Sequence, residues 1–185
     1  MRIIAGLAKG MSLVAPKHGD TRPTSDRVRE AVFSGLGERV VGADVLDLFA
    51  GTGALGLEAA SRGARAVTFV ETASAARRSL QQNIESLRSR PDVRCPLVVS
   101  RGEALYEVRR FAAARQMFSL IFADPPYGET AEALLSFEPL AAVLTAEGLF
   151  VLERAKRDTL VVQCGWKLLR EATYGDTKVS FLAKG

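Results

Sequence analysis

A carboxylate followed by two prolines and an aromatic residue has the clearest chemical potential in this sequence. It reads Asp124-Pro125-Pro126-Tyr127 and comes directly after the apolar run 118–123. Such a run predicts a strand buried on both faces, and parallel strands deliver their carboxyl ends to a ligand crevice. Because proline has no backbone N–H and a φ fixed at about −65°, the local carbonyl groups are held in place and unpaired by any helix.

These groups suit a planar base that carries an exocyclic amine. The Asp124 carboxylate and the Pro125 carbonyl can accept the amine N–H groups, and the Tyr127 ring can stack on the base. We therefore predict Asp124, Pro125 and Tyr127 as catalytic residues. The alternative is a surface turn after a core strand, because Asp-Pro is a common turn opener.

A glycine-rich segment supplies a second motif. Residues 51–56 read G-T-G-A-L-G, and Glu71 lies twenty residues beyond Gly51, the spacing of an acid that binds ribose hydroxyls. The spacing permits a dinucleotide, but Asp47 would repel a pyrophosphate and attract an amino group or a sulfonium. S-adenosylmethionine, which has a cationic methionine part and no phosphate, fits better than NAD. The alternative is a tight strand-to-helix turn with a helix-capping acid.

The elements that must position these groups alternate between strand and helix. Strands are predicted at 45–49, 66–70, 96–99, 118–123 and 148–153. Between them we predict a helix through 57–61, a long helix that ends at about 88, and helices at about 103–115 and at 131–144. This alternation predicts an α/β fold with a doubly wound parallel sheet. Two further strands, 166–172 and 178–183, flank a Gly175-Asp176 turn and predict an antiparallel hairpin at one edge of the sheet.

The N-terminal residues are predicted to form an addition to this core. Residues 2–15 read as a small β-hairpin, and a helix begins near Asp26 with Thr24 or Ser25 as its cap. The apolar stripe of that helix is Val28, Val32, Phe33 and Leu36. We expect a single domain over 1–185, with an extension over 1–38 and a catalytic core over 43–185.

Composition matches an ordinary soluble protein, with 48% hydrophobic and 25% charged residues. No apolar run approaches the roughly 20 residues that span a bilayer, and the N-terminus does not read as a signal peptide, so we expect a cytoplasmic protein. Cys95 and Cys164 are far apart and are expected to be buried apolar residues. We therefore expect no structural metal site. The only histidine, His18, is assigned no role.

Positive charge is concentrated near the N-terminus. Residues 1–30 hold six basic and three acidic side chains, whereas the other 155 residues hold 19 basic and 18 acidic ones. This distribution predicts a surface that binds a phosphate backbone. The candidate RNA-binding residues are Arg2, Lys9, Arg22, Arg27 and Arg29. The alternative is a solvated arm.

Together these motifs resemble the class I, seven-stranded S-adenosylmethionine-dependent methyltransferases of amino-nucleobases. The segments M-R-I-I-A-G at 1–6, R-P-T-S-D-R-V-R-E at 22–30, D-L-F-A-G-T-G-A-L-G-L-E-A at 47–59 and D-P-P-Y at 124–127 resemble the RsmD family over most of the chain. That family methylates the N2 amine of one guanine in bacterial small-subunit ribosomal RNA. The resemblance implies a Rossmann-like fold, S-adenosylmethionine as cofactor, no metal, no membrane, and ribosomal RNA in the small subunit or its precursor as partner.

The resemblance also implies a set of cofactor-binding residues. They are Asp47, Phe49, Gly51, Gly53 and Glu71. After the third strand such enzymes often place Asp or Asn against the adenine amine, whereas this chain offers Gly102 or Glu103. Two other functions stay open. One is an adenine-N6 or cytosine-N4 DNA methyltransferase, although 185 residues leave no separate target-recognition domain. The other is a non-catalytic RNA-binding assembly factor, in which D-P-P-Y or the glycine motif would be lost.

Overall fold

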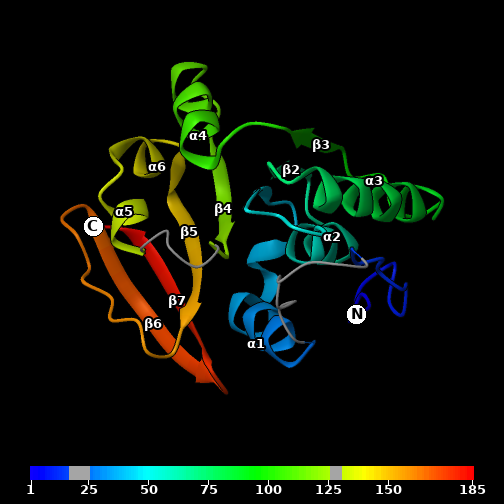
Figure 1. Ribbon diagram of the computed structural model, residues 1–185, viewed down its shortest axis with the longest axis horizontal. Coiled ribbons are helices and arrows are strands. Elements are labelled where there is room, and N and C mark those ends of the chain that lie inside the picture. The colour runs from blue at the N-terminus through cyan, green and yellow to red at the C-terminus, as the bar shows by residue number, and fades with distance from the viewer. Residues whose placement is uncertain (17–25, 126–130) are drawn as a thin grey trace.

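The computed structural model describes residues 1–16, 26–125 and 131–185. Their strands form one seven-stranded sheet of order β3-β2-β1-β4-β5-β7-β6 (Figure 1). The strands are β1 (Asp44–Leu48), β2 (Ala66–Val70), β3 (Leu97–Ser100), β4 (Phe118–Ala123), β5 (Leu144–Ala155), β6 (Trp166–Tyr174) and β7 (Thr177–Lys184). The first five are parallel, and β7 is antiparallel to both β5 and β6. The predicted mostly parallel sheet with a C-terminal hairpin is confirmed.

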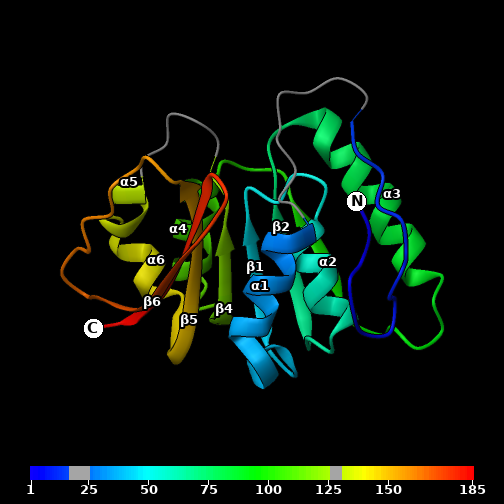
Figure 2. The same ribbon diagram turned by 90° about the horizontal axis from the view of Figure 1, so that it is seen from below.

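Helices cover both faces of the sheet (Figures 1 and 2). They are α1 (Asp26–Leu36), α2 (Ala54–Ser61) and α3 (Ser74–Arg88) on one face, and α4 (Ala104–Ala113), α5 (Ala131–Leu135) and α6 (Glu138–Ala142) on the other. A short 3-10 helix, η1 (Gly37–Val40), follows α1. Because both faces are covered, β1, β2 and β4 are apolar along nearly their whole length. None of the described helices is long and apolar enough to cross a membrane.

The predicted stripe of α1 is confirmed as its buried face. Val28, Val32, Phe33 and Leu36 are all buried. The Phe33 ring packs on Phe122 of β4 with ring centroids 5.7 Å apart. This contact places α1 over the centre of the sheet, with its first residues toward the edge at which β4 ends (Figure 2).

Three predictions about local structure and burial are wrong. The helix predicted over 131–144 is broken into α5 and α6, because Pro139 has no backbone N–H and its ring would clash with the preceding helical turn. The predicted fifth strand was too short, since β5 also pairs with β7 beyond the end of β4. The cysteines were expected to be buried, but Cys164 is exposed and Cys95 is half-buried, as both lie in connecting segments.

The first part of the predicted N-terminal extension, residues 1–16, contains one isolated antiparallel bridge, Arg2–Ser12, in place of the two predicted hairpin strands. This segment, called the extension below, is attached to α2 by buried polar groups. The Glu58 carboxylate accepts the backbone N–H groups of Ile4 and Ala5 at 2.7 and 3.0 Å. The Ser61 hydroxyl accepts the Ala8 N–H at 2.9 Å and donates to the Ala5 carbonyl at 2.6 Å. Buried groups with these partners hold the extension beside α2 and α3 (Figure 2).

Candidate functional site

Three carboxylates come together at the edge where the parallel strands end. Asp47 is the fourth residue of β1, Glu71 follows β2, and Asp124 follows β4, and β1 lies between the other two strands. Asp47 is only 3% exposed. Burial raises the pKa of Asp47 to about 7, and the nearby Asp124 and Glu71 carboxylates also raise it. Among the described residues, no group of three or more His, Cys, Asp or Glu side chains is arranged to hold a metal ion.

Asp47 makes a hydrogen bond to the end of the glycine-rich segment 51–56. Its Oδ2 accepts the backbone N–H of Gly56 at 2.8 Å, and this bond favours the charged form of the carboxyl group. The sequence interpretation gave Asp47 the role of attracting a cationic ligand. The structure gives it a buried backbone partner in the first turn of α2, and its attraction of a cationic ligand stays a prediction.

The pH dependence of stability tests this placement. A carboxyl group with a folded-state pKa above its unfolded value of 3.8 keeps its proton longer in the folded state, so its contribution to stability falls as pH rises from about 4 to 7. Asp47→Asn keeps an oxygen for the Gly56 N–H and cannot ionise. As pH rises from about 5 to about 8, the unfolding free energy of the wild type should therefore fall by roughly 2 to 3 kcal/mol relative to that of the variant. Urea denaturation measures this, and parallel pH profiles would contradict it.

The turn between β1 and α2 has an unusual backbone. Phe49, Gly51 and Gly53 have φ angles of 59°, 57° and 82°. The left-handed region costs a non-glycine residue about 1 to 2 kcal/mol, so the surrounding fold must hold Phe49 there. A Cβ on Gly53 would lie 2.4 Å from Leu80 Cδ1, whereas a Cβ on Gly51 would meet only the Phe49 carbonyl oxygen, at 3.9 Å, among the described residues. Gly53 is required for packing, and Gly51 leaves the backbone accessible to a ligand.

Glu71 faces this accessible backbone. Its Oε2 accepts the Gly51 N–H at 2.7 Å and its Oε1 accepts the Ala73 N–H at 2.7 Å. Each carboxylate oxygen can accept a second hydrogen bond, and Glu71 is half-buried. A pair of hydroxyl donors such as a ribose diol fits this arrangement.

The segment after β3 continues the same edge, since the Glu71 N–H donates to the Ser100 carbonyl at 3.2 Å. Gly102 packs against the buried Glu107, whose Oε1 would lie 2.2 Å from a Cβ at position 102. Glu103 is exposed and precedes α4. Both residues lie near the predicted site, and which of them faces an adenine stays a prediction.

Two of the three predicted catalytic residues lie within the part of the chain that the structure describes. Asp124 and Pro125 are half-buried at the end of β4, next to the turn after β1. Tyr127, and also Arg22 of the basic set, lie outside the described residues.

The structure separates the basic residues into two kinds. Arg2, Lys9 and Arg27 are exposed. Arg29 is fully buried, and its Nη2 donates to the Arg2 carbonyl at 2.6 Å and to Asp26 at 2.7 Å. Burial lowers the pKa of Arg29, while Asp26 and the more distant Glu58 and Glu153 favour its charged form. The prediction that Arg29 binds RNA is corrected, because a buried guanidinium cannot reach a phosphate; it joins α1 to the extension.

Sequence reasoning also missed Asn83, Glu58 and Ser61, which are buried polar residues on α2 and α3. The signal for Asn83 was present, because it interrupts the apolar stripe of Leu80, Ile84 and Leu87 on α3. A polar residue in a buried stripe must find hydrogen-bond partners, and these partners come from distant parts of the chain.

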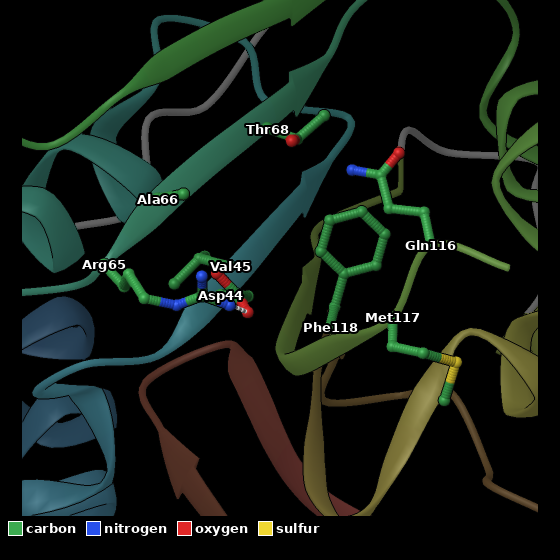
Figure 3. A pocket seen from close by; sticks show the side chains of 8 residues that line it. All are labelled: Asp44, Val45, Arg65, Ala66, Thr68, Gln116, Met117 and Phe118. Atoms are coloured by element: carbon green, nitrogen blue, oxygen red, sulfur yellow. Dashed lines mark hydrogen bonds and ion pairs between the residues drawn. The ribbon is translucent and has the colours of Figure 1, made fainter. Parts of the chain in front are cut away.

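A cavity of about 210 Å³ lies away from these residues (Figure 3). It is lined by Asp44, Val45, Arg65, Ala66, Thr68, Gln116, Met117 and Phe118. Asp44, Ala66 and Phe118 are the first residues of β1, β2 and β4, and Asp44 pairs with Arg65. The cavity is therefore at the opposite edge of the sheet from the three carboxylates, and no predicted site residue lines it.

Known proteins are similar to this chain over nearly its whole length. A family described as Conserved hypothetical protein 95 matches residues 1–183. A Bacillus subtilis protein provisionally named rRNA methyltransferase YlbH is 36% identical over 100% of this chain and 99% of its own length. "Ribosomal RNA small subunit methyltransferase D" of Haemophilus influenzae is 33% identical over 95% of this chain and 89% of its own length.

Solved structures share the fold. An Escherichia coli protein provisionally named a methyltransferase is 32% identical, with a TM-score of 0.81 over 100% of this chain and 97% of that one. Another provisionally named methyltransferase, complexed with SAH, is 18% identical with a TM-score of 0.64 over 85% of this chain and 48% of that one, which shows the fold alone. The sheet order and these likenesses establish a Rossmann-like class I methyltransferase fold.

Proposed function

The chain belongs to the RsmD family, and from this membership we propose that it is a ribosomal RNA methyltransferase that uses S-adenosylmethionine and modifies the N2 amine of a guanine in the small ribosomal subunit. The observation that carries the proposal is the meeting of Asp124, Glu71 and the glycine-rich turn at one edge of the sheet. The names of the relatives support ribosomal RNA as the substrate. The choice of guanine N2 rests on the D-P-P-Y segment and the family resemblance.

The cofactor site has the chemistry that S-adenosylmethionine requires. When bound, this cofactor supplies a methyl group on a sulfonium. Glu71 accepts hydrogen bonds from the ribose hydroxyls, and the open side of Gly51 lets the ligand approach the backbone closely. Asp47 holds the turn in shape through Gly56. Gly102 or Glu103 lies on the adenine side.

Asp124 and Pro125 prepare the amine for reaction. Guanine N2 is a poor nucleophile because its lone pair is delocalised into the ring. Acceptors on both N–H groups favour a pyramidal nitrogen and direct its lone pair toward the methyl carbon. Glu71 and the Gly51 backbone would hold the cofactor so that it could supply the methyl group, and Asp124 would accept the amine proton. Tyr127 is proposed to stack on the base, a contact worth about 1 to 3 kcal/mol.

The direct test is methylation of ribosomal RNA. Small ribosomal subunits and their RNA, isolated from a strain that lacks the protein, would be incubated with the enzyme and S-adenosylmethionine. Mass analysis of the nucleosides should show one new N2-methylguanine. Methylated adenine or cytosine instead would contradict the specificity, and no methylation of either substrate would favour a non-catalytic assembly factor.

Glu71→Ala should weaken binding of S-adenosylhomocysteine by roughly 1 to 3 kcal/mol, because a charge-assisted hydrogen bond to the ribose is lost. Isothermal titration calorimetry measures this. Glu85→Ala is the matched control, since Glu85 is exposed on α3, where its carboxylate accepts a hydrogen bond from Gln81. Equal affinity in both variants would remove Glu71 from the site, and tight NAD binding without a response to S-adenosylhomocysteine would overturn the cofactor.

A further inference from the structure

Asn83 is a fully buried side chain whose amide makes three hydrogen bonds. Its Oδ1 accepts the Val14 N–H at 2.7 Å. Its Nδ2 donates to the Val14 carbonyl at 3.0 Å and to the Thr52 carbonyl at 2.9 Å. One side chain of α3 therefore joins two segments that lie 69 and 31 residues away in the sequence.

Both of these segments belong to regions for which a function is proposed above. Thr52 lies within the glycine-rich turn, between the left-handed residues Gly51 and Gly53. Val14 is near the end of the extension, 1–16, which also carries the exposed Arg2 and Lys9. Asn83 is thus a direct link between the proposed cofactor turn and the proposed RNA-binding extension.

The link holds one peptide unit of the turn at both of its ends. The Thr52 carbonyl accepts from Asn83, and the N–H of the same peptide unit, on Gly53, donates to the Ala50 carbonyl at 2.7 Å. Glycine has the greatest backbone freedom of any residue, so a turn with two glycines needs such restraints to keep one shape. Leu80, one helical turn before Asn83, contacts the same turn at Gly53.

We infer that Asn83 is a positioning residue through which the N-terminal extension holds the glycine-rich turn in its cofactor-binding shape. This inference rests on the proposed function, because it takes the turn to bind S-adenosylmethionine. The extension then contributes to cofactor affinity as well as to any contact with RNA. Preorganisation of this kind lowers the cost of binding, because the turn does not have to be ordered by the ligand.

Asn83→Ala removes all three hydrogen bonds. The dissociation constant for S-adenosylhomocysteine and the KM for S-adenosylmethionine should both rise by about 5- to 20-fold, while kcat at saturating cofactor stays within about twofold. A role in stability alone would not produce this separation of KM from kcat. Calorimetry, steady-state kinetics and urea denaturation are run on the same preparations.

Ser119→Ala is the control, because it removes the hydrogen bond that the Ser119 hydroxyl accepts from the Asp44 N–H at the opposite edge of the sheet and none of the extension or the turn. It should lower the unfolding free energy and leave affinity for S-adenosylhomocysteine unchanged. Val14→Pro removes the Val14 N–H at an exposed position. It should weaken cofactor binding by about 2- to 5-fold even if Asn83→Ala does not fold.

The outcomes separate the two proposals. Unchanged cofactor affinity in Asn83→Ala, or in Val14→Pro where Asn83→Ala is unfolded, would overturn the inference and leave the proposed function standing. A wild-type protein that does not bind S-adenosylhomocysteine would overturn both.

Discussion

Asp124→Asn should reduce methyl transfer by about 10² to 10⁴-fold while affinity for S-adenosylhomocysteine stays within about threefold. The amide has nearly the shape of the carboxylate, but it cannot accept the amine proton, and its NH₂ group would face the N–H groups of the substrate. Single-turnover transfer of a labelled methyl group to small-subunit RNA or particles measures the chemical step.

Asp44→Asn is the matched control for this variant. Asp44 begins β1, on the strand that also carries Asp47, but at the opposite edge of the sheet, where it pairs with Arg65. Turnover of Asp44→Asn should stay within about twofold of the wild type. Near-wild-type turnover in Asp124→Asn would contradict the role given to the carboxylate, and loss of activity in both variants would point to a general effect on the fold.

The combined change of Arg2, Lys9 and Arg27 to Ala should weaken RNA binding about 100-fold, if each contact with a phosphate is worth about 1 kcal/mol. Each neutralised phosphate releases counterions, so the log–log salt dependence of binding should also flatten by about two to three units. Filter binding over a range of salt concentrations measures both effects. Arg29 is left intact because it is buried and bonded to Asp26 and the Arg2 carbonyl, so its loss would report on stability.

A second triple variant supplies the control. Arg90, Arg94 and Lys167 are exposed and lie toward the amino-terminal edge of the sheet, Arg90 and Arg94 between α3 and β3 and Lys167 near the start of β6. Their replacement by Ala removes the same charge and should change the salt slope much less. Equal slopes in the two variants would indicate a non-specific charge effect. An unchanged salt slope together with lost cofactor binding in the first variant would indicate that Arg2, Lys9 and Arg27 serve the cofactor site and do not bind RNA.

The sequence by itself determined that the sheet is mostly parallel with a C-terminal hairpin, and it placed the predicted site residues at strand ends. Apolar runs bounded by turn residues predicted β2 and β4 to the residue, because strands buried on both faces have a pattern that depends only on the strand itself. The same reasoning placed Asp124 and Glu71 at the ends of parallel strands, where alternation of strand and helix brings them together. Local patterns were sufficient because these features depend on residues that are close in the sequence.

Only the tertiary structure decided the roles of the buried polar residues. Arg29 looked like an exposed base in a basic segment, yet Asp26 and the Arg2 carbonyl bind it, and Glu58 and Glu153 of distant elements favour its charge. Asn83 likewise finds its partners 31 and 69 residues away. Burying a polar group is favourable only when such partners are in place, and their assembly depends on how helices and the extension pack on the sheet. No local pattern in the sequence contains that information.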